Sequence, residues 1–384
     1  MSFKKILVVF VCLAFLAVAV SCKKKSGETI KIGAIFAVTG PASFLGAPEA
    51  KTAQMIIDEI NSSGGVDGKS LELIIKDSTG SPEKAISFAK QLIEENKVFA
   101  IIGPSTSGET MKIKAICEDG KTILLSCAAA EDIVNPVAKY VFKTPQKDSY
   151  AAEKIFEVMK KKGITTIGVV ASNDGFGLAG KKQLETIAPK FGITILIGEV
   201  YDKKATDLTG VLTKLKANNV QAVVNWSIVP AQSIVPKNMK QLNMNVPLFQ
   251  SHGFGNIKYA REAGAAGEGI IFPCGRLLIV DTLPDNHPQK AVLAKYKKNY
   301  EGKYGEDVST FGGHAYDAVM ILVEAIKKAG ADKEKVRDAI ESLKGFAGTG
   351  GIFNFSVQDH NGLAIDSFDM LTVKGGKFVK YEDK

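Results

Sequence analysis

The stretch IKIGAIF, which runs from Ile30 to Phe36, is a short apolar segment with the character of a buried β-strand. The residues after it contain one apolar helical face, formed by Ala53, Ile56, Ile57 and Ile60. A second apolar segment, Leu71–Lys76, follows this helix. The chain therefore begins with a strand, a helix and a strand, which is the repeating unit of a parallel sheet.

The same alternation continues along most of the chain. Ser81 and Pro82 are predicted to open the next helix, with serine as the N-cap and proline at the first helical position. Further strands are predicted at Val98–Ile102, Thr122–Ser126, Thr165–Ala171, Ile193–Val200, Gln221–Asn225 and Pro247–Gln250. Near the C-terminus we expect a short strand at Phe353–Phe355 and a hairpin over Asp369–Val379. This pattern predicts a doubly wound parallel α/β architecture, and 384 residues predict two such domains.

The composition is that of a folded, soluble chain. Hydrophobic residues make up 45% and charged residues 23%, with both signs interspersed, which excludes an extended disordered chain. The net charge is +8, but the lysines are scattered along the sequence. We therefore interpret the excess as a solvated surface, rather than a nucleic-acid or anionic-lipid footprint, and expect no nucleic-acid partner.

The N-terminus predicts export. Lys4 and Lys5 precede an apolar run from Ile6 to Val20, which suits a signal peptide and is short for a bilayer-spanning helix of about 20 residues. The run ends in Ala19-Val20-Ser21-Cys22, which resembles a bacterial lipobox. We expect residues 1–22 to be a lipoprotein signal peptide with Cys22 as the lipid attachment site. An uncleaved anchor or a plain secretory peptide is the alternative.

No metal site or cofactor is predicted. The three cysteines beyond the signal peptide and the four histidines show no metal-ligand spacing: Cys117, Cys127, Cys274, His252, His287, His314 and His360. Cys117 and Cys127 could pair in an oxidising compartment, whereas isolated buried thiols are the simpler interpretation.

Two motifs suggest other functions without the context that those functions need. Gly175–Gly180 matches the G-x-G-x-x-G of dinucleotide-binding domains, but it lies in mid-chain and three residues separate it from its strand. Gly103–Gly108 looks like a nucleophile elbow, but G-x-S-x-G would require glycine where Ser107 stands. We therefore expect a binding protein and not an enzyme.

Several ordered segments along the mature chain carry a family resemblance. They are Ile32–Ala34 through Thr39–Pro41, Asp58–Asn61 with Gly64, Gly65 and Gly68, Gly103 and Pro104 with Ser107, Ser126 with Ala128 and Ala129, Phe176 and Gly177, Gly253 with Gly255 and Asn256, and Ala315–Ala318. Together they resemble type I periplasmic binding proteins of the branched-chain amino-acid (Leu/Ile/Val-binding) ABC importers.

The resemblance implies two α/β lobes that are joined by three crossover strands and close on a small solute like a hinged clamp. The crossovers would lie near Gln146, Gly275 and Ser356. The N-terminal lobe would comprise residues 29–146 plus 276–355, and the C-terminal lobe residues 147–275 plus 356–384.

The resemblance also implies where a ligand carboxylate binds. Ser107 would cap a helix, so that its hydroxyl and the free N–H groups hold the carboxylate, although a capping serine without a ligand role is the alternative. Ala128 would offer its carbonyl and Ala130 its N–H to the polar head of the ligand. Ala130 stands where amino-acid binders usually have a threonine that contacts this head group.

The remaining ligand-binding residues implied by the resemblance are mostly apolar. Leu45 would border the side-chain pocket, and Phe176 stands where amino-acid binders commonly use tyrosine. Trp226, the only tryptophan, either reaches the pocket or belongs to the core. His252, unless it is a core or surface histidine, stands where amino-acid binders place an acidic residue, and a protonated histidine would repel a ligand ammonium.

These departures favour a small carboxylate without an α-amine, aliphatic or aromatic, as the ligand. A branched-chain amino acid is the alternative ligand, and a sensor that feeds a signalling partner is the alternative role. The expected partners are the solute and the permease and ATPase subunits of an ABC importer. We expect a monomer that contacts the membrane only through its lipid.

Overall fold

The first five strands form one parallel sheet in the computed structural model, which describes residues 29–382. Its order is β2 (Leu71–Asp77), β1 (Ile30–Phe36), β3 (Ala100–Ile102), β4 (Ile123–Ser126) and β5 (Val141–Lys143). Side chains of β1 enter two different cores, because Ile32 and Ala34 pack on one face of the sheet and Ile35 on the other. The sheet is therefore buried on both faces, as parallel sheets usually are.

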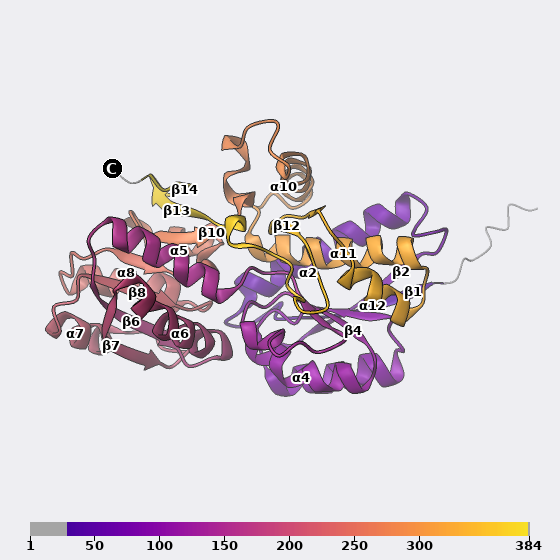
Figure 1. The fold of residues 1–384 in the computed structure, drawn as a ribbon, viewed down its shortest axis with the longest axis horizontal. Helices are drawn as coiled ribbons and strands as arrows, with labels where there is room; N and C mark the ends of the chain where they lie inside the picture. The colour runs from indigo at the N-terminus through magenta and orange to yellow at the C-terminus, as the bar shows by residue number, and fades with distance from the viewer. Residues whose placement is uncertain (1–28, 383–384) are drawn as a thin grey trace, which may run out of the picture.

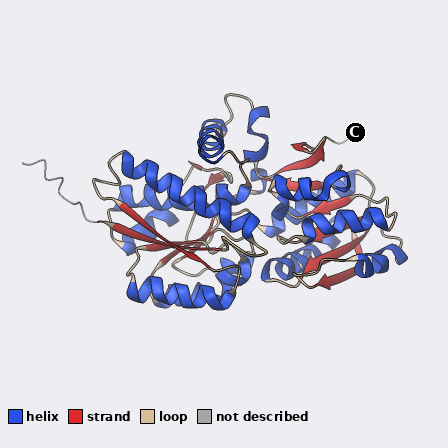
Figure 2. Ribbon diagram, turned by 180° about the vertical axis from the view of Figure 1, so that it is seen from behind, coloured by secondary structure: helices blue, strands red, loops and turns tan. Residues whose placement is uncertain are grey.

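Helices cover both faces of this first sheet (Figure 2). One face packs against α2 (Ser43–Ser62) and α11 (Thr310–Ala329), with α12 (Lys333–Glu341) beside α11. Helix α10 (Lys290–Tyr304) lies outside this layer, where the Tyr296 hydroxyl is 2.8 Å from the Thr52 hydroxyl of α2 (Figure 1). The other face packs against α3 (Pro82–Lys90) and α4 (Ser107–Asp119). The predicted start of α3 is confirmed, since the Ser81 hydroxyl accepts the N–H of Lys84 and Pro82 is the first helical residue.

The second sheet has seven strands and forms the second lobe, which lies beside the first in Figure 1. Five parallel strands make up most of it: β7 (Thr194–Tyr201), β6 (Thr166–Ser172), β8 (Ala222–Trp226), β9 (Leu248–Gln250) and β10 (Ile271–Cys274). The antiparallel hairpin of β13 (Asp369–Lys374) and β14 (Lys377–Lys380) adds to the edge of β10, as the sequence predicts for the C-terminus. The helices of this lobe are α5 (Asp148–Lys161), α6 (Gly175–Ile187), α7 (Thr209–Ala217), α8 (Ala231–Gln241) and α9 (Ile257–Ala263). A small third sheet joins β11 (Phe346–Ala347) to β12 (Ile352–Phe353).

The two-lobe, doubly wound α/β architecture is thus confirmed. The chain passes from the first sheet to the second between β5 and α5, and it returns after β10. It passes again after Leu363, which packs in the first lobe, and before Phe368, which packs in the second. The lobe boundaries implied by the resemblance stay a prediction.

The connections between the lobes are hydrogen-bonded to one another. The amide of Asn361 donates to the Pro145 carbonyl at 2.7 Å, and the Gln146 amide donates to the Gly350 carbonyl at 2.7 Å. Lys143 is fully buried here and donates to the carbonyls of Pro145 and Gln146 at 2.9 and 3.1 Å. The hinge is therefore an ordered bundle of chain segments and not a loose linker.

Within residues 29–382, no helix has the length and apolar character needed to cross a bilayer. The predicted signal peptide and Cys22 lie outside the described residues.

Candidate functional site

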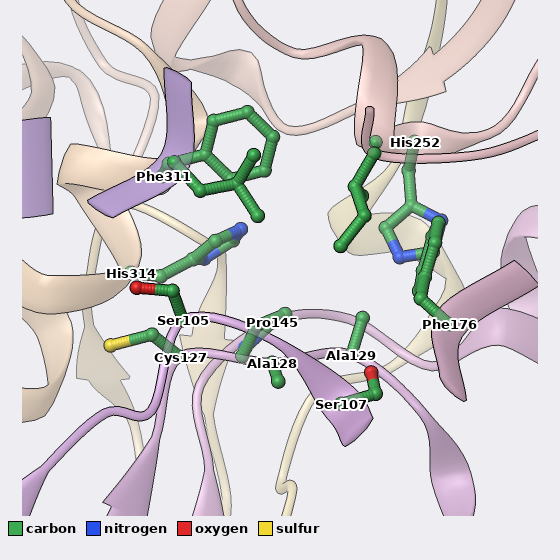
Figure 3. Close-up of a pocket in the computed structure, with 13 residues that line it drawn as sticks. Ser105, Ser107, Cys127, Ala128, Ala129, Pro145, Phe176, His252, Phe311 and His314 are labelled. Carbon is green, nitrogen blue, oxygen red and sulfur yellow. The ribbon is translucent and has the colours of Figure 1, made fainter. Parts of the chain in front are cut away.

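A small cavity lies between the two lobes (Figure 3). The first lobe and the hinge contribute Leu45, Ser105, Ser107, Cys127, Ala128, Ala129, Pro145, Phe311 and His314 to its lining. The second lobe contributes Phe176, Ile228, His252 and Gly253. Of the residues expected from the sequence, the structure brings together Leu45, Ser107, Ala128, Phe176 and His252 around this cavity.

The lobes touch each other beside the cavity. The first turns of α4 and α6 meet at Gly108 and Gly175, where a Cβ placed on Gly175 would lie 2.8 Å from the Gly108 Cα. The Asn256 amide of the second lobe donates to the Phe44 carbonyl of the first lobe at 3.0 Å. The Phe44 ring also packs 5.1 Å from that of Tyr259, measured between ring centroids. The structure therefore has the two lobes closed against each other.

Ser107 lies at the N-terminus of α4, but it is not the cap that the sequence suggests. The N-cap is Thr106, whose extended backbone suits that position and whose hydroxyl accepts the N–H of Glu109. Ser107 is the first helical residue, so its own N–H has no acceptor within the helix. The positive end of α4 and the Ser107 hydroxyl together favour an anion at this end of the cavity.

Ala130 lies outside the cavity lining, although we expect its N–H to face the ligand, and Trp226 lies in the core, one of the two positions considered for it. The Ala130 N–H donates to the Ser107 hydroxyl oxygen at 3.2 Å, so it holds this side chain in place instead of facing a ligand. Trp226 is fully buried, with its ring 5.8 Å from the Phe176 ring and 5.7 Å from that of His252. It is a core residue that supports two residues of the cavity wall.

The glycines of the G-x-G-x-x-G segment have packing roles. Gly175 allows the contact with the other lobe, and a Cβ on Gly180 would lie 1.9 Å from the Trp226 Nε1. Asp174 caps α6, since its Oδ1 accepts the N–H groups of Phe176 and Gly177 at 2.9 and 3.0 Å. The motif therefore positions Phe176 in the cavity wall and Trp226 in the core behind it.

His252 is neutral in this environment, so the repulsion that a protonated histidine would exert on a ligand ammonium does not apply. Burial holds the pKa of His252 well below its usual value, and the charge of Lys143 lowers it further. Its Nε2 lies 3.4 Å from Oδ1 of Asp148, a buried residue outside the cavity lining. Burial raises the pKa of Asp148 to about 8, with Lys143 acting in the opposite direction.

His314 and Ser105 are lining residues that the sequence reasoning missed. Burial and then the charge of Lys143 lower the pKa of His314 to about 3. The Ser105 hydroxyl accepts the Ala37 N–H at 3.0 Å and forms a short hydrogen bond with Glu49. Ser105 directly follows Gly103 and Pro104, and His314 directly precedes Ala315–Ala318, which are segments that carry the family resemblance. This adjacency could have indicated that both residues lie near the cavity.

Cys127 lines the cavity, and Cys117, Cys127 and Cys274 are all free and buried. The part of the chain that the structure describes contains no group of three or more side chains that could hold a metal ion. Because all three thiols are free, the structure agrees with isolated buried cysteines and not with a Cys117–Cys127 disulfide.

Comparisons with known proteins agree with this architecture. The model of the periplasmic binding protein family matches residues 29–377. A Leucine-, isoleucine-, valine-, threonine-, and alanine-binding protein from Pseudomonas aeruginosa is 29% identical over 323 residues, which cover 83% of each chain.

Two solved structures extend this similarity to three dimensions. An extracellular ligand-binding receptor from Rhodopseudomonas palustris superposes with a TM-score of 0.87 at 27% identity, covering 92% of this chain and 99% of that chain. The substrate-binding protein of a Streptococcus pneumoniae branched-chain amino acid transporter, solved with isoleucine, has a TM-score of 0.81 at 26% identity, covering 91% and 98%. These relatives are binding proteins and not enzymes, as the sequence predicts for this chain. The chain therefore belongs to the type I periplasmic binding proteins of the branched-chain amino-acid transporter family, which are exported proteins that bind small solutes.

Proposed function

We propose that this protein captures a small carboxylate without an α-amine, by closure of its two lobes, and delivers it to an ABC permease. The observation that carries this proposal is the set of thirteen described residues that line the cavity, which contains no acidic side chain. A ligand ammonium would lose its water on entering the cavity without gaining a carboxylate partner, which is costly.

The carboxylate end of the ligand has a clear partner. The Ser107 hydroxyl and the positive end of α4 supply hydrogen-bond donors and a favourable field for an anion. The other walls include Leu45, Phe176, Ile228 and Phe311, which suit an aliphatic or aromatic body.

A branched-chain amino acid is the second candidate ligand. It is favoured by the similarity to the Streptococcus pneumoniae protein, which was solved with isoleucine. Attachment to the membrane through a lipid on Cys22 belongs to the same proposal and rests on the lipobox-like sequence alone.

Calorimetric titration of the protein comprising residues 23–384 tests which class of ligand it binds. The most informative comparison is leucine with 4-methylpentanoate, because the two differ only in the α-amine. Benzoate is added as an aromatic acid. We expect 4-methylpentanoate or benzoate to bind at least about tenfold more tightly than leucine, a difference of about 1.4 kcal/mol. Tight leucine binding with no binding of 4-methylpentanoate would overturn the proposal and favour the amino acid.

A serine variant checks where the carboxylate lies. Ser107→Ala is expected to weaken acid binding by about tenfold, since a hydrogen bond to a charged group contributes about 1.5–3 kcal/mol. Ser342, at the C-terminal end of α12, does not line the cavity. Ser342→Ala is therefore the matched control and is expected to leave binding unchanged.

A further inference from the structure

The cavity has two chemically different ends. Figure 3 shows Ser107, Ala129, Phe176 and His252 on one side, and Ser105, Cys127, Phe311 and His314 on the other. Ring contacts agree with this grouping, because Phe176 lies 5.4 Å from His252 and Phe311 lies 6.5 Å from His314. The positive end of α4 lies on the first side, where the carboxylate is proposed to bind. The second side is therefore next to the end of the ligand that is farthest from its carboxylate.

His314 has an unused hydrogen-bonding group at this second end. The residue is only 5% exposed, and no described residue is a hydrogen-bond partner of its Nδ1. Its backbone is fixed, since the Thr144 hydroxyl of the hinge segment donates to the His314 carbonyl at 3.0 Å. A buried polar atom without a partner costs free energy, so a ligand that supplies the partner gains affinity.

Among the described residues, no acidic side chain, lysine or arginine lines the cavity beside His314. Burial raises the pKa of Glu49 well above its usual value, so this carboxyl group beneath Ser105 keeps its proton. Lys143 lies behind the cavity wall; its charge lowers the pKa of His314, but its ammonium donates to the Pro145 and Gln146 carbonyls. A second charged group on the ligand would find no oppositely charged side chain in the described lining at this end, and a purely apolar one would leave the imidazole without a partner.

A hydroxyl satisfies both conditions. It is neutral, and it can donate to or accept from an imidazole whose ring nitrogens comprise one donor and one acceptor. The Ser105 hydroxyl, held between the Ala37 N–H and Glu49, provides a second polar atom nearby.

We propose that the preferred ligand is a small hydroxy acid, whose hydroxyl lies at the end opposite its carboxylate and hydrogen-bonds to His314. This inference rests on the proposed function, because it takes the carboxylate end as given. It makes His314 a residue that determines specificity.

Calorimetry with matched acids tests the inference. The probes are benzoate with 3- and 4-hydroxybenzoate, and pentanoate with 5-hydroxypentanoate. These acids differ in the distance between carboxylate and hydroxyl and in the flexibility of the link between them. We expect at least one hydroxylated acid to bind about tenfold more tightly than its parent. In His314→Phe, which keeps a ring of similar size, this ratio is expected to fall to about one, and in His314→Gln it is expected to be partly kept.

A histidine outside the cavity provides the control. His287 is half-buried, and its Nδ1 accepts the N–H of Gln289. His287→Gln is expected to keep the wild-type ratio of affinities. Thermal melting of each variant establishes that it folds before its affinities are compared.

The two proposals fail in different ways. If the parent acids bind and the hydroxyl gives no gain, or if the gain survives in His314→Phe, only the hydroxy-acid inference is wrong. If no acid binds while leucine does, the proposed function and this inference fail together.

Discussion

His314 shows at the residue scale how burial fixes the charge of a side chain. Its pKa is about 3 in the folded protein, whereas a free histidine has a pKa of 6.5. Below pH 6.5 the unfolded chain therefore binds a proton at this position that the folded chain does not bind. Stability is expected to fall as the pH drops from 6.5 toward 3, by up to about 1.4 kcal/mol per pH unit from this residue.

Removing the imidazole should remove that contribution. His314→Phe is expected to lose less stability than the wild type between pH 7 and pH 4, as measured by calorimetric melting. Phe311→Leu changes the same end of the cavity without a titratable group, and it should keep the wild-type dependence on pH. Equal dependence in all three proteins would show that His314 is protonated in the folded state.

Sequence reasoning located the cavity wall but not the hydrogen bonds within it. The family resemblance places Ser107 at the ligand site, and its position between a strand and a helix suggests that it is the N-cap. The cap is Thr106 instead, because a sequence pattern leaves the first residue of a helix uncertain by one or two positions. The partner of Ala130 could not be foreseen, since Ser107 and Ala130 belong to different loops that meet only in the fold. His314 was missed because a histidine within an apolar helix has no distinguishing pattern of its own.

The first turn of α6 shows how a single element positions the cavity. Asp174 accepts the N–H groups of Phe176 and Gly177, and its Oδ2 also accepts the Ser172 hydroxyl at 2.7 Å. Asp174→Ala is expected to cost about 1 kcal/mol of stability, as the loss of an N-cap usually does. It should also weaken ligand binding several-fold, because Phe176 lies within the turn that the cap holds.

A second helix supplies the matched control for this prediction. Asp332 caps α12 by accepting the Lys335 N–H at 3.0 Å, and α12 contributes no residue to the cavity. Asp332→Ala should lower the melting temperature by a similar amount and leave affinity unchanged. If both variants bind the ligand equally well, the α6 cap does not position Phe176.

Among the helices and strands, the sequence predicts most strands, and the strands that it does not predict have unusual compositions. The longer strands show an apolar run bounded by turn residues, and β1 matches its predicted bounds. Strand β5 has three residues and ends in Lys143, a charge that is seldom buried. Strand β10 contains Pro273, which argues against a strand within a sheet.

The contact between Gly108 and Gly175 sets how closely the whole molecule can close. A side chain on Gly175 would meet the backbone nitrogen and Cα of Gly108 at 2.8 Å, and a helix backbone cannot yield locally. Gly175→Ala is therefore expected to shift the equilibrium toward a more open form. The ligand affinity should fall about tenfold or more, while the unliganded protein melts at nearly the same temperature.

Another glycine in the first turn of a helix serves as the control. A Cβ on Gly210, in α7, would meet no atom within 4 Å. Gly210→Ala should bind like the wild type, and small-angle scattering with saturating ligand should show a larger radius of gyration for Gly175→Ala alone. An unchanged affinity in Gly175→Ala would mean that closure at this point does not contribute to binding.

The position of Trp226 has a spectroscopic consequence. It is the only indole in the chain, and its ring lies directly behind Phe176 and His252 in the cavity wall. Indole emission moves to longer wavelength when water approaches the ring. The protein therefore carries its own optical reporter, so that ligand arrival and lobe motion can be followed in real time without an attached dye.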